Sequence, residues 1–213
     1  MPTYVRPGLD LGPQLRDDGL PYGNDWPDPT PEATYSRVSH PERFAPLHAV
    51  ADALLTHLVE TYDVTIDDDP PLDAFPGDPF AVVRVVGLVP ATDDAPPLTI
   101  AWTPFPGIRL HAGAAADVAL PACGCDACDD DIESLLDELE GTVLAVVSGG
   151  LSESVRDRQL TTSIASRRHR RNAGPRAGSG VTSQARFSST EAERLRAVLA
   201  VAPDGWAPWP LRS

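Results

Sequence analysis

The sequence contains no lysine, so all 17 of its basic residues are arginine. A lysine-free chain rich in Ala, Asp and Arg is typical of a GC-rich genome, and we attribute this bias to the genome rather than to function. The N-terminus lacks the basic region followed by an apolar stretch that marks a secretory signal. No apolar run approaches the roughly 18–20 residues of a membrane span, so no membrane association is predicted.

Cysteine is also scarce, with three residues that all fall within positions 123–128. An odd number of cysteines so close together does not fit a disulfide framework. Disulfides persist mainly in oxidising compartments. We therefore predict a cytoplasmic protein whose thiols are reduced.

Acidic residues outnumber basic ones, and the net charge is −14. Such a surface disfavours binding to nucleic acid or to anionic membranes. The charge is uneven, because residues 1–150 carry 6 Arg and 26 acidic residues whereas residues 151–213 carry 11 Arg and 5 acidic residues. The basic part either balances charge within the molecule or meets an acidic protein partner. The basic run at 167–171 has no interleaved aromatic residue for base stacking, so a flexible basic loop over 167–180 is predicted.

The chain length fits one domain of ordinary hydrophobic content. Residues 1–33 show neither a period of 2 nor one of 3.6, and they are rich in Pro, Gly and Asp. This pattern predicts an irregular N-terminal arm, followed by an α+β domain over 34–213. Trp206 and Trp209 lie in a Pro-rich tail and are expected to anchor it onto that domain.

Periodicity predicts the secondary structure of the domain. An apolar stripe indicates a helix over about 46–62, and a second stripe with acidic residues at its start indicates a helix over 131–147. A capping box at 190–193 predicts a last helix. Strands are expected at 80–89, 98–103, 108–111, within 151–166 and at 181–187. The prediction is an antiparallel sheet, including a three-stranded meander over 80–111, packed with about three helices.

The cluster Cys123-Gly-Cys125-Asp-Ala-Cys128 is the most specific chemical feature. A Cys-x-x-Cys turn brings two sulfur atoms to one side, and Gly124 gives the backbone freedom to direct the third. Zn²⁺ takes four ligands in a tetrahedron and favours thiolates. We predict that the three cysteines are ligands of a zinc ion.

The fourth ligand has several candidates. His111 is the first, because it ends a predicted strand that leads toward the cysteines. Asp126 and Asp129 are alternatives, and a water molecule would give the open geometry of a catalytic zinc site.

Two alternatives to metal binding remain open. Cys125-Asp-Ala-Cys128 precedes a helix, as redox-active pairs do, but the βαβ setting of those pairs is not predicted here. Nearby acidic residues also raise thiol pKa values, whereas a divalent cation reverses that balance. The other alternative is a tight loop holding three small, half-buried thiols.

Three segments carry a resemblance to a known family. Pro41-Glu-Arg-Phe-Ala-Pro-Leu-His48, the pair Phe105-Pro-Gly107 and His111-Ala-Gly113, and the cysteine cluster together resemble an uncharacterised bacterial family of actinobacterial type with a CGCDAC motif. The resemblance covers about residues 35–160 and implies no activity, because this is a domain of unknown function.

Three hypotheses of function follow. The first is a non-enzymatic module stabilised by zinc through Cys123, Cys125 and Cys128, with His111 as a further ligand. The second is an enzyme, either zinc-dependent or of another kind, with no catalytic residue assigned. The third is a module that binds a protein partner through its charge asymmetry.

Overall fold

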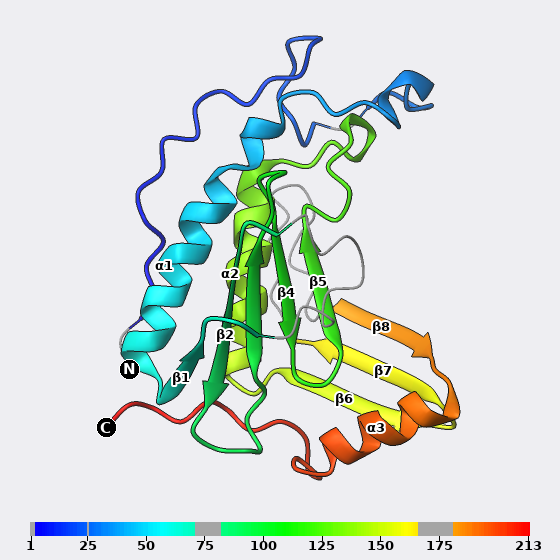
Figure 1. Cartoon of the computed structure of the whole chain (residues 1–213). Helices are drawn as coiled ribbons and strands as arrows, with labels where there is room; N and C mark the ends of the chain where they lie inside the picture. The colour runs from blue at the N-terminus through cyan, green and yellow to red at the C-terminus, as the bar shows by residue number, and fades with distance from the viewer. Residues whose placement is uncertain (1–2, 25, 71–81, 166–180) are drawn as a thin grey trace.

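Two antiparallel sheets and three α-helices make up the fold, which confirms the predicted α+β class (Figure 1). This computed structural model describes residues 3–24, 26–70, 82–165 and 181–213. The basic loop expected at 167–180 lies outside the described residues. The elements are α1 (Pro46–Thr61), β1 (Val64–Asp67), β2 (Arg84–Pro90), β3 (Leu98–Trp102), β4 (Ile108–Ala112), β5 (Ala116–Leu120), α2 (Ile132–Val147), β6 (Leu151–Arg156), β7 (Gln159–Ile164), β8 (Val181–Arg186) and α3 (Ser189–Leu199), with short 3₁₀ turns at Glu32–Thr34, Pro41–Phe44 and Asp126–Cys128.

The larger sheet is a five-stranded antiparallel meander in the order β1-β2-β3-β4-β5. Its three central strands correspond to the predicted meander, although the first of them begins at Arg84 and the residues expected before it lie partly in 71–81, outside the described part. The outer strands β1 and β5 were not predicted. The register pairs Ile108 with Leu120 and His111 with Asp117, which fixes the end of the sheet from which the chain leaves β5.

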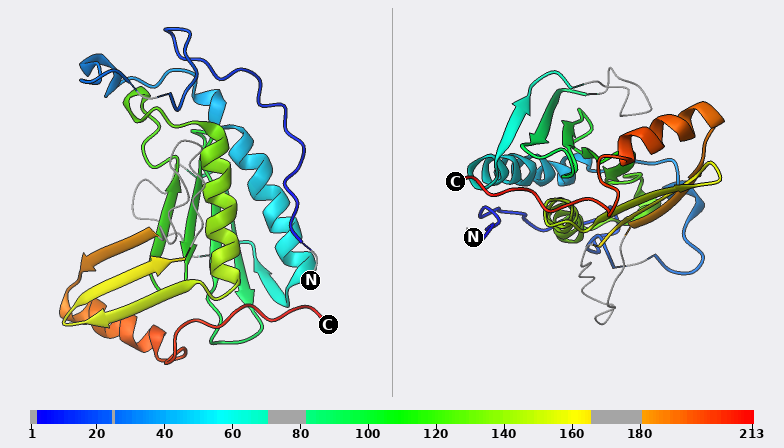
Figure 2. Two further views of the ribbon diagram at one scale, coloured as in Figure 1. Left: turned by 180° about the vertical axis from the view of Figure 1, so that it is seen from behind. Right: turned by 90° about the horizontal axis from the view of Figure 1, so that it is seen from below.

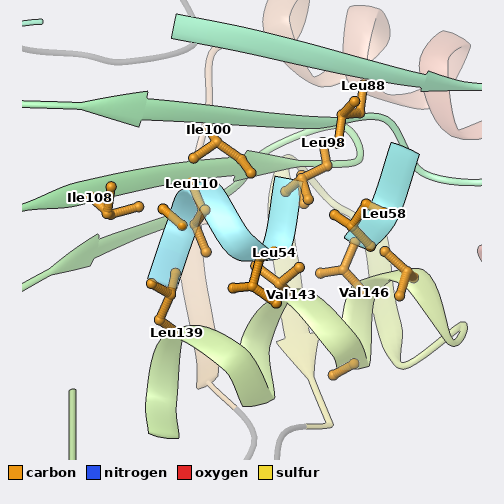
Figure 3. Close-up of a cluster of buried hydrophobic side chains, with 14 of the residues drawn as sticks. Leu54, Leu58, Leu88, Leu98, Ile100, Ile108, Leu110, Leu139, Val143 and Val146 are labelled. Carbon is orange, nitrogen blue, oxygen red and sulfur yellow. The ribbon is translucent and has the colours of Figure 1, made fainter. Parts of the chain in front are cut away.

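The hydrophobic core lies between this sheet and the helices α1 and α2 (Figure 3). Both helices contribute the apolar stripes that their sequences predict. Fully burying one such side chain stabilises the fold by about 1.5–3 kcal/mol. The labelled core residues are Leu54 and Leu58 of α1, Leu139, Val143 and Val146 of α2, and Leu88, Leu98, Ile100, Ile108 and Leu110 of the sheet.

The smaller sheet, β6-β7-β8, follows α2 and packs against α3 (Figure 2). The chain within 151–166 forms two strands, and the last predicted strand is present as β8. The capping box of α3 uses Ser188 and Glu191, two residues earlier than predicted. Ser188 is therefore the N-cap, so the helix begins two residues earlier and Thr190 lies within its first turn.

The C-terminal tail is anchored by its two tryptophans, as predicted. Both are buried, and the Nε1 of Trp209 donates to the carbonyl of Pro96 at 2.8 Å. Beyond them, the tail pairs with the end of α1 through the bridge between Tyr62 and Leu211. Among the described helices, none has the length and apolarity needed to cross a membrane.

Candidate functional site

The three cysteines meet in the loop that joins β5 to α2, residues 121–131, which we call the cysteine loop. Their sulfur atoms all lie within 4.8 Å of one another, and the Sγ atoms of Cys125 and Cys128 are 3.5 Å apart. Four sulfurs bound to zinc at about 2.3 Å in a tetrahedron are about 3.8 Å apart. The sulfur atoms are therefore already near the spacing that a shared Zn²⁺ requires.

The three thiols differ in exposure. Cys125 is buried, with 8% of its surface exposed, whereas Cys123 and Cys128 are exposed. Cys125 thus forms the floor of the cluster and the other two form its rim. An ion held by all three would lie at the protein surface.

Hydrogen bonding makes the thiols of Cys125 and Cys128 differ in acidity. Burial acts to raise the pKa of Cys125, but hydrogen bonds from the thiol of Cys123 and from the loop backbone outweigh it and hold the pKa below its usual range. Although Cys128 is an exposed residue, partial desolvation of its thiol, with the hydrogen bonds to Cys125 and Cys123, raises its pKa to about 12. Negative charge in the cluster is therefore favoured on Cys125 over Cys128, and a bound cation would stabilise it on both.

Gly124 allows the tight backbone path between Cys123 and Cys125. Its φ is +82°, and a Cβ at this position would lie 2.6 Å from the Cζ of Phe105. The Phe105 ring packs on Phe44, with ring centroids 5.5 Å apart, so it has little freedom to move away. Glycine is therefore needed for the conformation that brings the thiols together.

We expect Gly124→Ala to weaken zinc binding about tenfold, because an L-residue in the left-handed region costs about 1–2 kcal/mol. The affinity is measured by competition with a coloured chelator. Gly8→Ala is the matched control, since a Cβ at Gly8 meets nothing within 4 Å. Binding by Gly124→Ala that is as tight as in the wild type would contradict this role.

Asp126 lies in the same loop but faces the N-terminal segment, defined here as residues 3–24 and 26–40. Its Oδ1 accepts a hydrogen bond from the Ser39 backbone N–H at 2.8 Å, and its Oδ2 accepts one from the Arg37 Nε at 2.7 Å. The Trp26 Nε1 donates a hydrogen bond to the backbone carbonyl of Asp126 at 2.9 Å. Burial acts to raise the pKa of Asp126, but the bonds from Ser39 and Arg37 outweigh it and lower the pKa. Asp126 thus joins the cysteine loop to the N-terminal segment.

Asp129 forms an ion pair with the same N-terminal segment, although within the described residues neither of its carboxylate oxygens has a hydrogen-bond partner. It is buried, and its Oδ2 lies 3.2 Å from the Nη1 of Arg16. The Arg16 guanidinium also lies over the ring of Trp26, 4.0 Å from its centroid. Within the described residues, the structure does not place either aspartate in the group of potential metal ligands, which holds only the three cysteines.

His111 is positioned away from the cysteine loop. Its Nδ1 lies 2.7 Å from the Oδ1 of Asp117, its cross-strand partner. The cysteine loop begins after Leu120, whose partner on β4 is Ile108. Ile108 and His111 are three residues apart along β4, which corresponds to about 10 Å. A ligand role for His111 remains a prediction that this geometry does not favour.

Sequence patterns missed a second polar centre, at Glu153 on β6. Its carboxylate accepts hydrogen bonds from the backbone N–H groups of Ala114 and Ala115 at 2.8 and 2.9 Å, and from the Trp206 Nε1 at 2.8 Å. The sequence did contain one indication of this buried glutamate, because strand alternation puts Glu153 on the same face as the apolar Leu151. The contacts of Arg16 and Arg37 had no such signal, since they join residues about 90 or more positions apart.

Comparison with known proteins gives one match. Residues 14–213 match a family described as a family of unknown function, DUF6226. This range is longer than the resemblance at 35–160 and includes the part of the N-terminal segment that contacts the cysteine loop. No curated protein and no solved structure matches the chain.

Proposed function

The chain belongs to the DUF6226 family of unknown function, and we propose that it is a zinc-stabilised, non-enzymatic module. Cys123, Cys125 and Cys128 bind one Zn²⁺. The observation that carries the proposal is the convergence of three sulfur atoms within 4.8 Å of one another. Thiolates are the ligands that structural zinc sites use most, and a bound divalent cation would stabilise all three cysteines as thiolates.

The ion acts as a brace for a part of the chain that has little hydrophobic core. The cysteine loop joins the end of β5 to the start of α2, where Asp131 caps the helix by accepting a hydrogen bond from the Ser134 backbone N–H. Through Asp126 and Asp129, the same loop holds the N-terminal segment (Figure 1). Three metal bonds that fix the cysteine loop would therefore order both the connection from β5 to α2 and the contact with the N-terminal segment.

A structural role fits the surrounding carboxylates better than a catalytic one. A zinc enzyme needs a general base near the metal-bound water. Asp126 and Asp129 are instead held by Arg37 and Arg16 in ion pairs of 2.7 and 3.2 Å. Since their charge is used to hold the N-terminal segment, the proposal includes no reaction.

Elemental analysis tests the proposal directly. We expect one equivalent of zinc per chain in protein purified without added metal, and less than a tenth of an equivalent in a variant with all three cysteines changed to serine. Thiol titration of the native protein should report protected thiols that become reactive on chelation. A zinc content of zero together with three freely reactive thiols would refute zinc binding, and a disulfide between Cys125 and Cys128 would favour the redox alternative.

A further inference from the structure

We infer that the cysteine loop is a redox switch, in which a peroxide oxidises Cys125 and Cys128 to a disulfide and the zinc ion is released. This inference rests on the proposed zinc site and adds regulation to it. The site then has two states, a reduced state in which zinc braces the loop and an oxidised state in which this brace is lost.

The first argument is the geometry of the turn that carries the two thiols. The backbone N–H of Cys128 donates to the carbonyl of Cys125 at 3.1 Å, and residues 126–128 form a 3₁₀ turn. A turn closed in this way keeps the Cα atoms of its first and fourth residues within about 7 Å, and a disulfide requires about 4.4–6.8 Å. The two Sγ atoms are already 3.5 Å apart, so small side-chain rotations bring them to bonding distance.

The second argument is the unequal exposure of the two thiols. Cys128 is exposed, so a small oxidant in solution reaches its sulfur, whereas only 8% of the surface of Cys125 is exposed. Bound zinc keeps both sulfurs deprotonated, and the thiolate is the form that attacks an oxidant. An accessible thiolate beside a second, resolving cysteine is the arrangement that redox-sensing sites use. Cys128 is therefore oxidised first, and Cys125 resolves the product.

The oxidation balances as two steps. The Cys128 thiolate attacks one oxygen of hydrogen peroxide, the O–O bond breaks, and a sulfenic acid forms as hydroxide leaves. The Cys125 thiolate then attacks the sulfenic sulfur, so that the S–S bond forms and a second hydroxide leaves. The two sulfurs lose two electrons in total, and these reduce one molecule of peroxide to two hydroxide ions.

Release of the zinc follows from the change in the sulfur atoms. Zinc binds cysteine as the thiolate, so the disulfide leaves Cys123 as the single thiolate of the cluster. The zinc bonds join Cys123, on the side of the loop that leaves β5, to the turn at 125–128. The disulfide joins only the two ends of that turn. Oxidation therefore removes the brace between β5 and the turn but leaves the turn itself closed.

Peroxide titration of the zinc-loaded protein tests the switch. The protein is prepared with a reductant, which is then removed, and hydrogen peroxide is added while a zinc-sensitive dye reports free metal. We expect one zinc ion to be released for each peroxide consumed, with a disulfide that peptide mapping places between Cys125 and Cys128. A thiol reductant with added zinc should restore the bound metal, because a disulfide is reversible whereas a sulfinic acid is not.

Serine variants assign the two sulfurs. Because the chain has no other cysteine, Cys123→Ser keeps only the proposed pair, and with peroxide it should form the same disulfide as the wild type. Cys128→Ser keeps Cys123 and Cys125, which a single residue separates. It should form at most about a tenth as much intramolecular disulfide, since so short a loop restricts the S–S torsion of about ±85–100°. An equal yield in Cys128→Ser would overturn the assignment.

The outcomes separate the switch from the zinc proposal. Absence of zinc from the reduced protein would refute the zinc site itself. Zinc that stays bound in a large excess of peroxide would overturn the switch and leave the zinc site intact. Zinc release with sulfinic or sulfonic acids in place of a disulfide, or with a disulfide between two chains, would overturn the switch as well.

Discussion

Removal of zinc is expected to lower the melting temperature of the protein by about 8–16 °C. A ligand present at 1,000 times its dissociation constant stabilises the folded state by about 4 kcal/mol, and each kcal/mol shifts the melting temperature by about 2–4 °C at this chain length. The effect arises because the unfolded chain does not hold the three thiols together. Differential scanning calorimetry of the zinc-loaded protein, with and without a strong chelator, measures it.

Cysteine variants show whether the chelator acts through this site. Cys125→Ser should melt close to the chelated wild type and should not respond to chelator. His111→Ala should respond as the wild type does, since its ring pairs with Asp117 at 2.7 Å. A chelator response that persists in Cys125→Ser would show that zinc stabilises the protein from another position.

The parts of the fold that sequence patterns predict well are those whose side chains carry a long apolar period. Both core helices satisfy this condition, as do the central strands of the meander. In contrast, β1 has only four residues, three of them exposed, and its alternation of apolar and polar residues is too short to distinguish it from the connection that follows α1. In β5, Val118 is the single β-branched residue, and alanines and Asp117 occupy most of the other positions, so the strand pattern is weak. These two strands form through backbone pairing with neighbours that do carry the pattern.

In the candidate site, too, some features follow from the local sequence and others depend on the tertiary structure. Spacing alone predicts the cysteine cluster, because a turn that joins residues three apart needs no knowledge of the fold. The fourth ligand depends on the strand register, which places His111 at the end of β4 away from the cysteine loop. The roles of Asp126 and Asp129 depend on the path of the N-terminal segment, which has no periodicity. Only the tertiary structure shows that these acidic residues are paired with arginine.

Glu153→Ala is expected to destabilise the protein by about 3–4 kcal/mol, because three buried or half-buried donors lose their acceptor. The carboxylate joins β6 both to the turn between β4 and β5 and to Trp206 in the C-terminal tail. The melting temperature should therefore fall by about 6–16 °C. Glu193→Ala is the matched control, since Glu193 lies on the exposed surface of α3 and its loss should change stability by less than about 0.5 kcal/mol.

The pH dependence of the stability difference between the wild type and Glu153→Ala gives a second readout. Burial raises the pKa of Glu153, although the hydrogen bonds from Ala114 and Trp206 partly oppose the shift. The folded state therefore holds this proton more tightly than the unfolded state, whose glutamate has a pKa of about 4.3. Stability contributed by this group is complete below that value and decreases as the pH rises through the folded pKa. The excess stability of the wild type over Glu153→Ala should thus shrink as the pH rises from 4, and a difference that grows with pH would show that hydrogen bonding outweighs the cost of burying the charge.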